Sequence, residues 1–108
     1  MRAILVSQGE IPIALVFHDH GTGDLYCRSV VRSFAAAFDA ECSKHAITFK
    51  KEGSKGEILR AVSSSPREYD WARSVIDQLC EGFWTSKDLG TVIGTESSID
   101  ATIRKYLI

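Results

Sequence analysis

The most polar cluster in the sequence is HDHGTGD, residues 18–24. His18 and His20 have the spacing that directs both imidazoles to the same side of a continuing strand, and Cys42 and His45 are spaced i, i+3 at the end of a predicted helix. Histidine and cysteine pairs of this kind are typical zinc ligands. Either pair alone is also common in solvated turns, and nothing in the sequence brings the two together. We therefore predict no metal site and no cofactor.

The glycines of this cluster allow two interpretations. GTGD follows a strand and precedes a predicted helix, where backbone N–H groups can bind phosphate, but it lacks the glycine spacing of a dinucleotide site and the lysine of a P-loop. The simpler interpretation is that Gly21 and Gly23 form a turn and Asp24 caps the helix. Because neither GxSxG nor HExxH is present, we predict that the chain is not an enzyme and name no catalytic residue. The alternative is a small metal- or phosphate-dependent enzyme centred on His18, His20 and Asp24.

A second candidate is TSKDLGTVIGTESSIDATIRKYLI, residues 85–108. Its pattern predicts a short helix, a turn at Gly94 and a second helix, which is the outline of a helix-turn-helix. In that motif the second helix presents polar side chains to the DNA major groove. The predicted DNA-facing residues are Ser97, Ser98, Thr102, Arg104 and Lys105. Acidic Glu96 and Asp100 would oppose the phosphates.

Positive charge lies in the middle of the chain, although the net charge is −1. Residues 44–67 contain six Lys and Arg against two Asp and Glu, whereas residues 68–108 contain four against seven. Lys50, Lys51 and Lys55 surround a glycine turn and can lie along a DNA backbone. Lysines at such positions also simply prevent an edge strand from pairing with another chain. If this chain binds DNA, its contacts with phosphate must therefore come largely from the basic hairpin, or from a dimer that brings two such hairpins together.

Apolar residues near the end of the chain predict a protein-binding surface. Trp84 follows Phe83 directly and so falls outside the buried stripe of its predicted helix, and the chain ends with Tyr106, Leu107 and Ile108. An apolar patch of this kind suits a protein partner or a twofold homodimer.

These residues must be positioned by elements that the sequence predicts in the order ββαββααα. Two strands flank Gln8-Gly9-Glu10, a helix covers residues 25–46, and two strands flank the basic loop EGSKG. A helix over residues 64–84 opens with Ser65, Pro66 and Glu68, the signature of a capping box. We predict an α+β fold in which a small antiparallel sheet and one long helix (1–64) join a three-helix unit (65–108) in one compact domain.

Composition agrees with one such domain. The chain has 108 residues, 44% of them hydrophobic and 25% charged, and its longest apolar run, IPIALVF, is far too short to span a bilayer. No signal peptide is recognisable, so we expect a cytoplasmic protein that does not bind membranes. The start MRAILVSQGEIPIALVF followed by a helix is loosely similar to the start of longin-type adaptor domains, but the later strands of that pattern are missing.

The first functional hypothesis is a small dimeric DNA-binding protein that regulates transcription through its C-terminal helices and basic hairpin. The alternative is an adaptor module that binds a protein through its terminal helices.

Overall fold

The computed structural model describes residues 1–44, 48–52, 57–62, 68–92 and 96–107. The elements follow the order βββαββαβα, which confirms the predicted α+β class. The strands are β1 (Arg2–Gln8), β2 (Ile11–His18), β3 (Leu25–Ser29), β4 (Thr48–Glu52), β5 (Ile58–Val62) and β6 (Thr85–Thr91), and the helices are α1 (Arg32–Ser43), α2 (Tyr69–Cys80) and α3 (Glu96–Leu107). None of the three described helices is long and apolar enough to cross a membrane.

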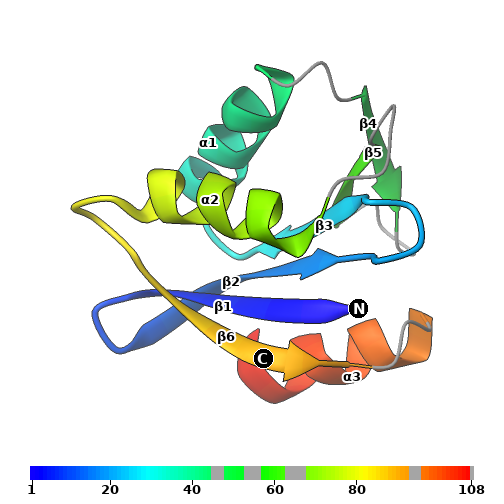
Figure 1. The fold of residues 1–108 in the computed structure, drawn as a ribbon. Coiled ribbons are helices and arrows are strands. Elements are labelled where there is room, and N and C mark those ends of the chain that lie inside the picture. Colours follow the sequence, from blue (N-terminus) through cyan, green and yellow to red (C-terminus); the bar gives the residue numbers. More distant parts are fainter. Residues whose placement is uncertain (45–47, 53–56, 63–67, 93–95, 108) are drawn as a thin grey trace.

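All six strands form one antiparallel sheet in the order β4-β5-β3-β2-β1-β6. Figure 1 shows α1 and α2 over one face of this sheet and α3 over the other. In β2, a central strand, every residue from Ile13 to His18 is buried. A strand with one open face would alternate between buried and exposed residues, so this continuous run reflects helices on both sides.

Alternation along the strands divides the apolar side chains between two cores. The first core lies under α1 and α2 and includes Ile4, Val16, Phe34, Phe38 and Ile76. The second core lies under α3 and includes Leu15, Phe17, Ile99 and Ile103. Both cores share β1 and β2, which therefore hold the three layers together.

Three predicted elements are confirmed. The first hairpin turns at Gly9, whose φ of 62° suits glycine, and β4 and β5 form the second hairpin. The last predicted helix is α3, and its Ile99 and Ile103 are buried on one face as their spacing indicates. The loop that joins β4 to β5 lies outside the described residues.

The first departure from prediction is β3, which the sequence assigns to the start of a long helix. Cys27 belongs to the first core and its neighbour Tyr26 to the second, which is the alternation of a strand. Phe34 and Phe38 of α1 share the first core with Cys27. Their common burial imitates one helical stripe, although two separate elements supply it.

The second departure is β6, which the sequence predicts as the first helix of the helix-turn-helix. Thr85–Thr91 instead pairs antiparallel with β1, from Ser7 opposite Thr85 to Arg2 opposite Thr91. The predicted helix-turn-helix and three-helix unit are therefore wrong. Pairing with a strand from the other end of the chain outweighs the local helix signal, a tertiary effect that no local pattern contains. The predicted turn residue Gly94 lies outside the described part of the chain.

The third departure is the end of α2. The predicted helix continues to Trp84, but α2 ends at Cys80 and the chain turns through Gly82, whose φ is 78°. This turn exchanges the environments of the next two residues: Phe83, predicted to be buried, is exposed, and Trp84 packs against the first core. The predicted cap residues Ser65 and Pro66 belong to a segment that is not described.

Candidate functional site

The polar loop after β2 is held together by its own side chains. The Gly21 N–H donates to Asp19 Oδ1 at 2.8 Å, the Gly23 N–H to the Asp19 carbonyl at 2.8 Å, and the Asp24 N–H to Thr22 Oγ1 at 3.2 Å. These three N–H groups are the donors that a phosphate would need. Because the loop already uses them, the structure gives the phosphate hypothesis no support.

The histidines and cysteine considered as metal ligands are partly brought together. The His18 and His20 rings meet edge to face with centroids 5.5 Å apart, but His18 is buried and His20 is exposed. Cys42 lies in the first core, where burial raises the pKa of its thiol to about 12, so it is not a thiolate at neutral pH. His45 lies outside the described residues. Within the described ranges no group of three or more His, Cys, Asp or Glu could hold a metal ion.

The prediction that Asp24 caps a helix is wrong, because Asp24 forms a buried ion pair instead. It precedes β3, and its Oδ2 accepts hydrogen bonds from Arg60 Nε at 2.9 Å and from a terminal guanidinium nitrogen of Arg60 at 2.7 Å. Arg60 lies on β5 opposite Tyr26 of β3, and its guanidinium is 5.2 Å from the Tyr26 ring centroid. The ion pair thus fixes the register of β3 against β5.

A second polar cluster connects α2 to the sheet. The Tyr69 hydroxyl donates to Asp88 Oδ2 at 2.7 Å, and the Arg2 guanidinium pairs with the same oxygen while lying 3.9 Å from the Tyr69 ring centroid. The hydrogen bond from Tyr69 lowers the pKa of Asp88. The pKa of Tyr69 is raised, mainly by burial and to a smaller extent by the same hydrogen bond. A phenol with a raised pKa stays protonated at neutral pH, so this geometry suits a structural tie better than a nucleophile.

The residues predicted to contact DNA do not form one surface. Lys50 and Lys51 are exposed on β4 and, as neighbours in a strand, point to opposite faces. Arg104 and Lys105 are exposed on α3 and Thr102 is half-buried there. Ser97 and Ser98 lie in the first turn of α3, and Lys55 is outside the described residues. Figure 1 shows β4 and α3 in separate parts of the molecule, so the two basic groups stay apart.

The residues predicted to bind a protein partner also separate. Trp84 is half-buried, and its ring meets the Phe34 ring edge to face at 5.2 Å. Tyr106 and Leu107 are half-buried against the second core. Ile108 is outside the described residues. Of this set, only Trp84 lies near the surface described next.

Three large hydrophobic side chains are mostly exposed in the described part of the chain, and they lie at the same end of the sheet. They are Ile11, with 69% of its surface exposed, Phe83, with 64%, and Val30, with 50%. We call this surface the apolar end. The sequence predicts one feature of this surface, the hairpin turn at Gln8-Gly9-Glu10 beside Ile11, but it does not predict that the three side chains share one end of the sheet.

The strand register shows why the three lie at the same end of the sheet. Ile11 pairs with Gln8 at the tip of the β1–β2 hairpin, and the Val30 N–H donates to the carbonyl of Ile13 at 2.9 Å. On the other side, β6 starts opposite Ser7, so Phe83 lies just beyond this same end of the sheet. Four strand ends therefore converge here.

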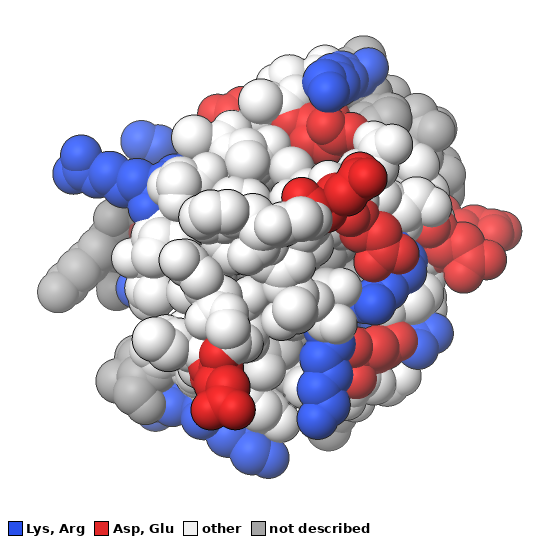
Figure 2. Space-filling model, turned by 90° about the vertical axis from the view of Figure 1, so that its left-hand side faces the viewer, with Lys and Arg blue, Asp and Glu red and all other residues white. Residues whose placement is uncertain are grey.

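An aromatic chain links the apolar end to α1. The Phe83 and Trp84 rings meet edge to face at 5.1 Å, and Trp84 in turn meets Phe34 in the first turn of α1. Figure 2 views this end of the molecule and shows a broad uncharged area, with Lys, Arg, Asp and Glu mainly around its margin. The apolar end thus rests on the first core through packed rings.

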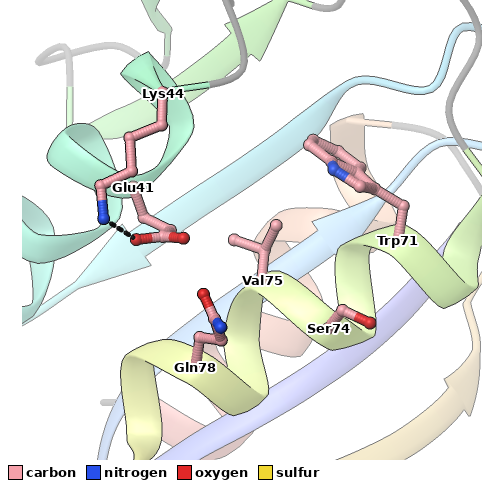
Figure 3. A pocket seen from close by; sticks show the side chains of 6 residues that line it. All are labelled: Glu41, Lys44, Trp71, Ser74, Val75 and Gln78. Atoms are coloured by element: carbon pink, nitrogen blue, oxygen red, sulfur yellow. Dashed lines mark hydrogen bonds and ion pairs between the residues drawn. The ribbon is translucent and has the colours of Figure 1, made fainter.

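A groove of about 390 Å³ lies between α1 and α2. It is lined by Glu41, Lys44, Trp71, Ser74, Val75 and Gln78. Figure 3 shows Glu41 and Lys44 at the end of α1 facing the side chains of α2, with Lys44 Nζ 3.0 Å from Glu41 Oε2. The ion pair already satisfies the charges on one wall, and the remaining lining is mixed in chemistry, so the groove selects no ligand class.

Comparison with protein-family models, with curated proteins and with solved structures gives no match. A functional interpretation therefore depends on the geometry of this chain.

Proposed function

We propose that this chain is a protein-interaction module and that its binding surface is the apolar end. The observation that carries the proposal is the gathering of Ile11, Val30 and Phe83 at one end of the sheet. Single exposed hydrophobic residues are normal on protein surfaces, but several of them at one end of a sheet are typical of an interaction site. Charged residues are depleted at the centre of protein interfaces and lie at the rim, as Figure 2 shows for this end.

The fold itself gives no reason for these exposures. Most of the other large apolar side chains of the described elements enter one of two cores, and Trp84, directly after Phe83, does so through Phe34. The Gly82 turn places Phe83 outside while directing Trp84 inward. An aromatic anchor supported from below by packed rings is pre-organised, which lowers the entropic cost of binding.

The free sheet edges are poorer candidates for a protein-binding surface. β6 carries mostly polar exposed side chains, and its register with β1 shifts next to Gly90, which has a φ of 83°. The other edge, β4, is a five-residue strand with exposed Lys50 and Lys51. Bulges, short strands and lysines are the usual features that prevent an edge from pairing with another chain.

Site-specific photo-crosslinking tests this proposal. A benzophenone amino acid replaces Phe83 in the cells that produce the protein, and the same amino acid at Lys87 of β6 is the matched surface control. We expect ultraviolet light to join position 83 to a protein, either another copy of the chain or a different one, with little product from position 87. Absence of protein adducts from positions 83, 11 and 30 would refute the proposal.

DNA binding is the second candidate function, and fewer residues support it than the sequence suggests. The exposed lysines Lys50 and Lys51 support it, whereas the helix-turn-helix does not exist in the described structure. Titration of random duplex DNA at low and moderate salt measures it, because phosphate contacts weaken steeply with salt. Binding that disappears in the Lys50→Ala/Lys51→Ala variant, but persists in Phe83→Ser, would favour DNA over a protein partner.

A further inference from the structure

We propose that the apolar end binds a second copy of this chain, so that two molecules associate about a twofold axis with their Ile11, Val30 and Phe83 side chains in contact. This inference rests on the proposed function, because it names the partner of the same surface. In a twofold interface the same patch serves both molecules and must therefore be complementary to itself. Three exposed apolar side chains satisfy this condition, since apolar surface then faces apolar surface.

Charge at the margin of the apolar end is complementary to itself as well. Glu10 lies beside Ile11, Glu81 lies two residues before Phe83, and Arg32 lies two residues after Val30, and all three are exposed. None of the three forms an ion pair within the part of the chain that the structure describes. A twofold arrangement allows Arg32 of each molecule to meet Glu10 or Glu81 of the other, and each such contact occurs twice.

The start of α1 offers a further reason for a carboxylate of a second molecule to bind beside Arg32. Its N-cap residue is Val31, which makes no side-chain capping bond, and its first turn contains no acidic residue. Valine is among the poorest N-cap residues, and a cation such as Arg32 is unfavourable beside the positive end of a helix. A carboxylate from a second molecule would compensate both the helix end and Arg32. The same residues that border Val30 are therefore arranged to accept an anion.

The size of the apolar end indicates a reversible dimer. An aromatic side chain buries about 150–250 Å². With half to two thirds of each side chain exposed, Ile11, Val30 and Phe83 offer about 300 Å² of apolar surface per molecule. A standard interface buries about 800 Å² per partner, so these side chains supply its centre and the polar margin must supply the rest. We therefore expect a reversible dimer whose population rises with protein concentration, rather than a permanent dimer.

Sedimentation velocity over a concentration series from micromolar to millimolar tests the inference, using the full chain. We expect wild type to shift from monomer to dimer. Phe83→Ser removes the same side chain from both molecules and should raise the dissociation constant about 100-fold. Lys87→Glu is the control for a change of surface charge. Lys87 lies on β6 away from the apolar end, so this variant should associate as wild type does. Thermal unfolding of each variant shows whether it remains folded.

Charge reversal with mixing identifies the twofold arrangement itself. Arg32→Glu alone and Glu10→Arg/Glu81→Arg alone each place like charges opposite one another and should stay monomeric. An equimolar mixture of the two variants should form dimers again, because every contact then joins opposite charges. If each variant alone stays monomeric and the mixture also forms no dimer, the twofold arrangement is refuted.

The outcomes separate this inference from the proposed function. A wild-type chain that stays monomeric at the highest concentration refutes the second copy as the occupant. If position 83 then crosslinks to a different protein, the protein-interaction function stands and only the identity of the partner was wrong. If position 83 crosslinks to no protein, both proposals fail.

Discussion

The ion pair between Asp24 and Arg60 gives the sharpest quantitative test of the fold. The Asp24 side chain is 3% exposed and the Arg60 side chain 28% exposed, so the two partners are buried to different degrees. Removing one partner of a buried pair leaves the other charge in a poorly solvated site, at a typical cost of about 3–5 kcal/mol. The cost depends on which charge is left behind.

Arg60→Ala leaves the more buried carboxylate without its guanidinium. We expect it to lower the free energy of unfolding by about 3–5 kcal/mol, the full range for a buried pair. Asp24→Ala leaves a guanidinium that water can partly reach, and we expect a smaller loss of about 2 kcal/mol. The double variant should lose less than the sum of the two, by at least about 1 kcal/mol, because the second substitution removes the charge that the first one stranded.

Urea unfolding at neutral pH measures all three variants against wild type, with circular dichroism and fluorescence as independent probes. Arg28→Ala is the matched control. Arg28 lies on neighbouring β3, and its guanidinium donates to the Ser29 carbonyl at 2.7 Å, so its loss should cost about 1 kcal/mol. The reasoning would be refuted if Asp24→Ala destabilised as much as Arg60→Ala, or if the two effects were additive.

Three further predictions concern other parts of the structure. The pKa of Asp88 is lowered in the folded state, chiefly by the Tyr69 hydroxyl, so the stability that Asp88 contributes is complete above its unfolded pKa of about 4 and is lost as pH falls through its folded pKa. Asp88→Asn should therefore reduce the loss of stability at acid pH in a curve of unfolding free energy against pH, and an unchanged loss would contradict this. Burial raises the pKa of Cys80 to about 11 and that of Cys42 to about 12, so Ellman's reagent should modify the native thiols far more slowly than the urea-unfolded ones. An alanine Cβ at Gly82 would meet no atom within 4 Å, so Gly82→Ala should lower the free energy of unfolding in urea only by the backbone strain of a φ of 78°, about 1 kcal/mol. A much larger loss of unfolding free energy would contradict this geometry.

Local patterns predicted those elements whose own side chains determine their structure. The β1–β2 hairpin follows from Gln8-Gly9-Glu10 between two β-rich runs, and α3 follows from the spacing of Ile99 and Ile103. The class of the fold followed from these elements. The basic hairpin was also predicted, because its two strands are adjacent in sequence and need only a short connection.

Distant pairing explains what the sequence did not predict. β6 pairs with β1, and its residues come from the far end of the chain. The cap-like residues Thr85 to Asp88 indicate a helix locally, but they are equally tolerated in a half-exposed edge strand. The predicted DNA-reading unit failed for this reason. The apolar end could not be predicted either, because Val30 and Phe83 reach the same end of the sheet as Ile11 only once the strands have paired.

The two ends of the sheet differ in what their residues contribute. The Arg2, Tyr69 and Asp88 cluster and the Asp24–Arg60 pair lie where β2 ends and β3 begins, and they connect elements to one another. The apolar end lies at the opposite ends of these strands, and the contact between the Phe83 and Trp84 rings links it to the first core. The polar residues that connect elements and the apolar residues that carry the proposed function therefore lie at opposite ends of the sheet. Stability and binding should then respond to different substitutions: Arg60→Ala should lower stability, and Phe83→Ser should weaken association while the sheet stays folded.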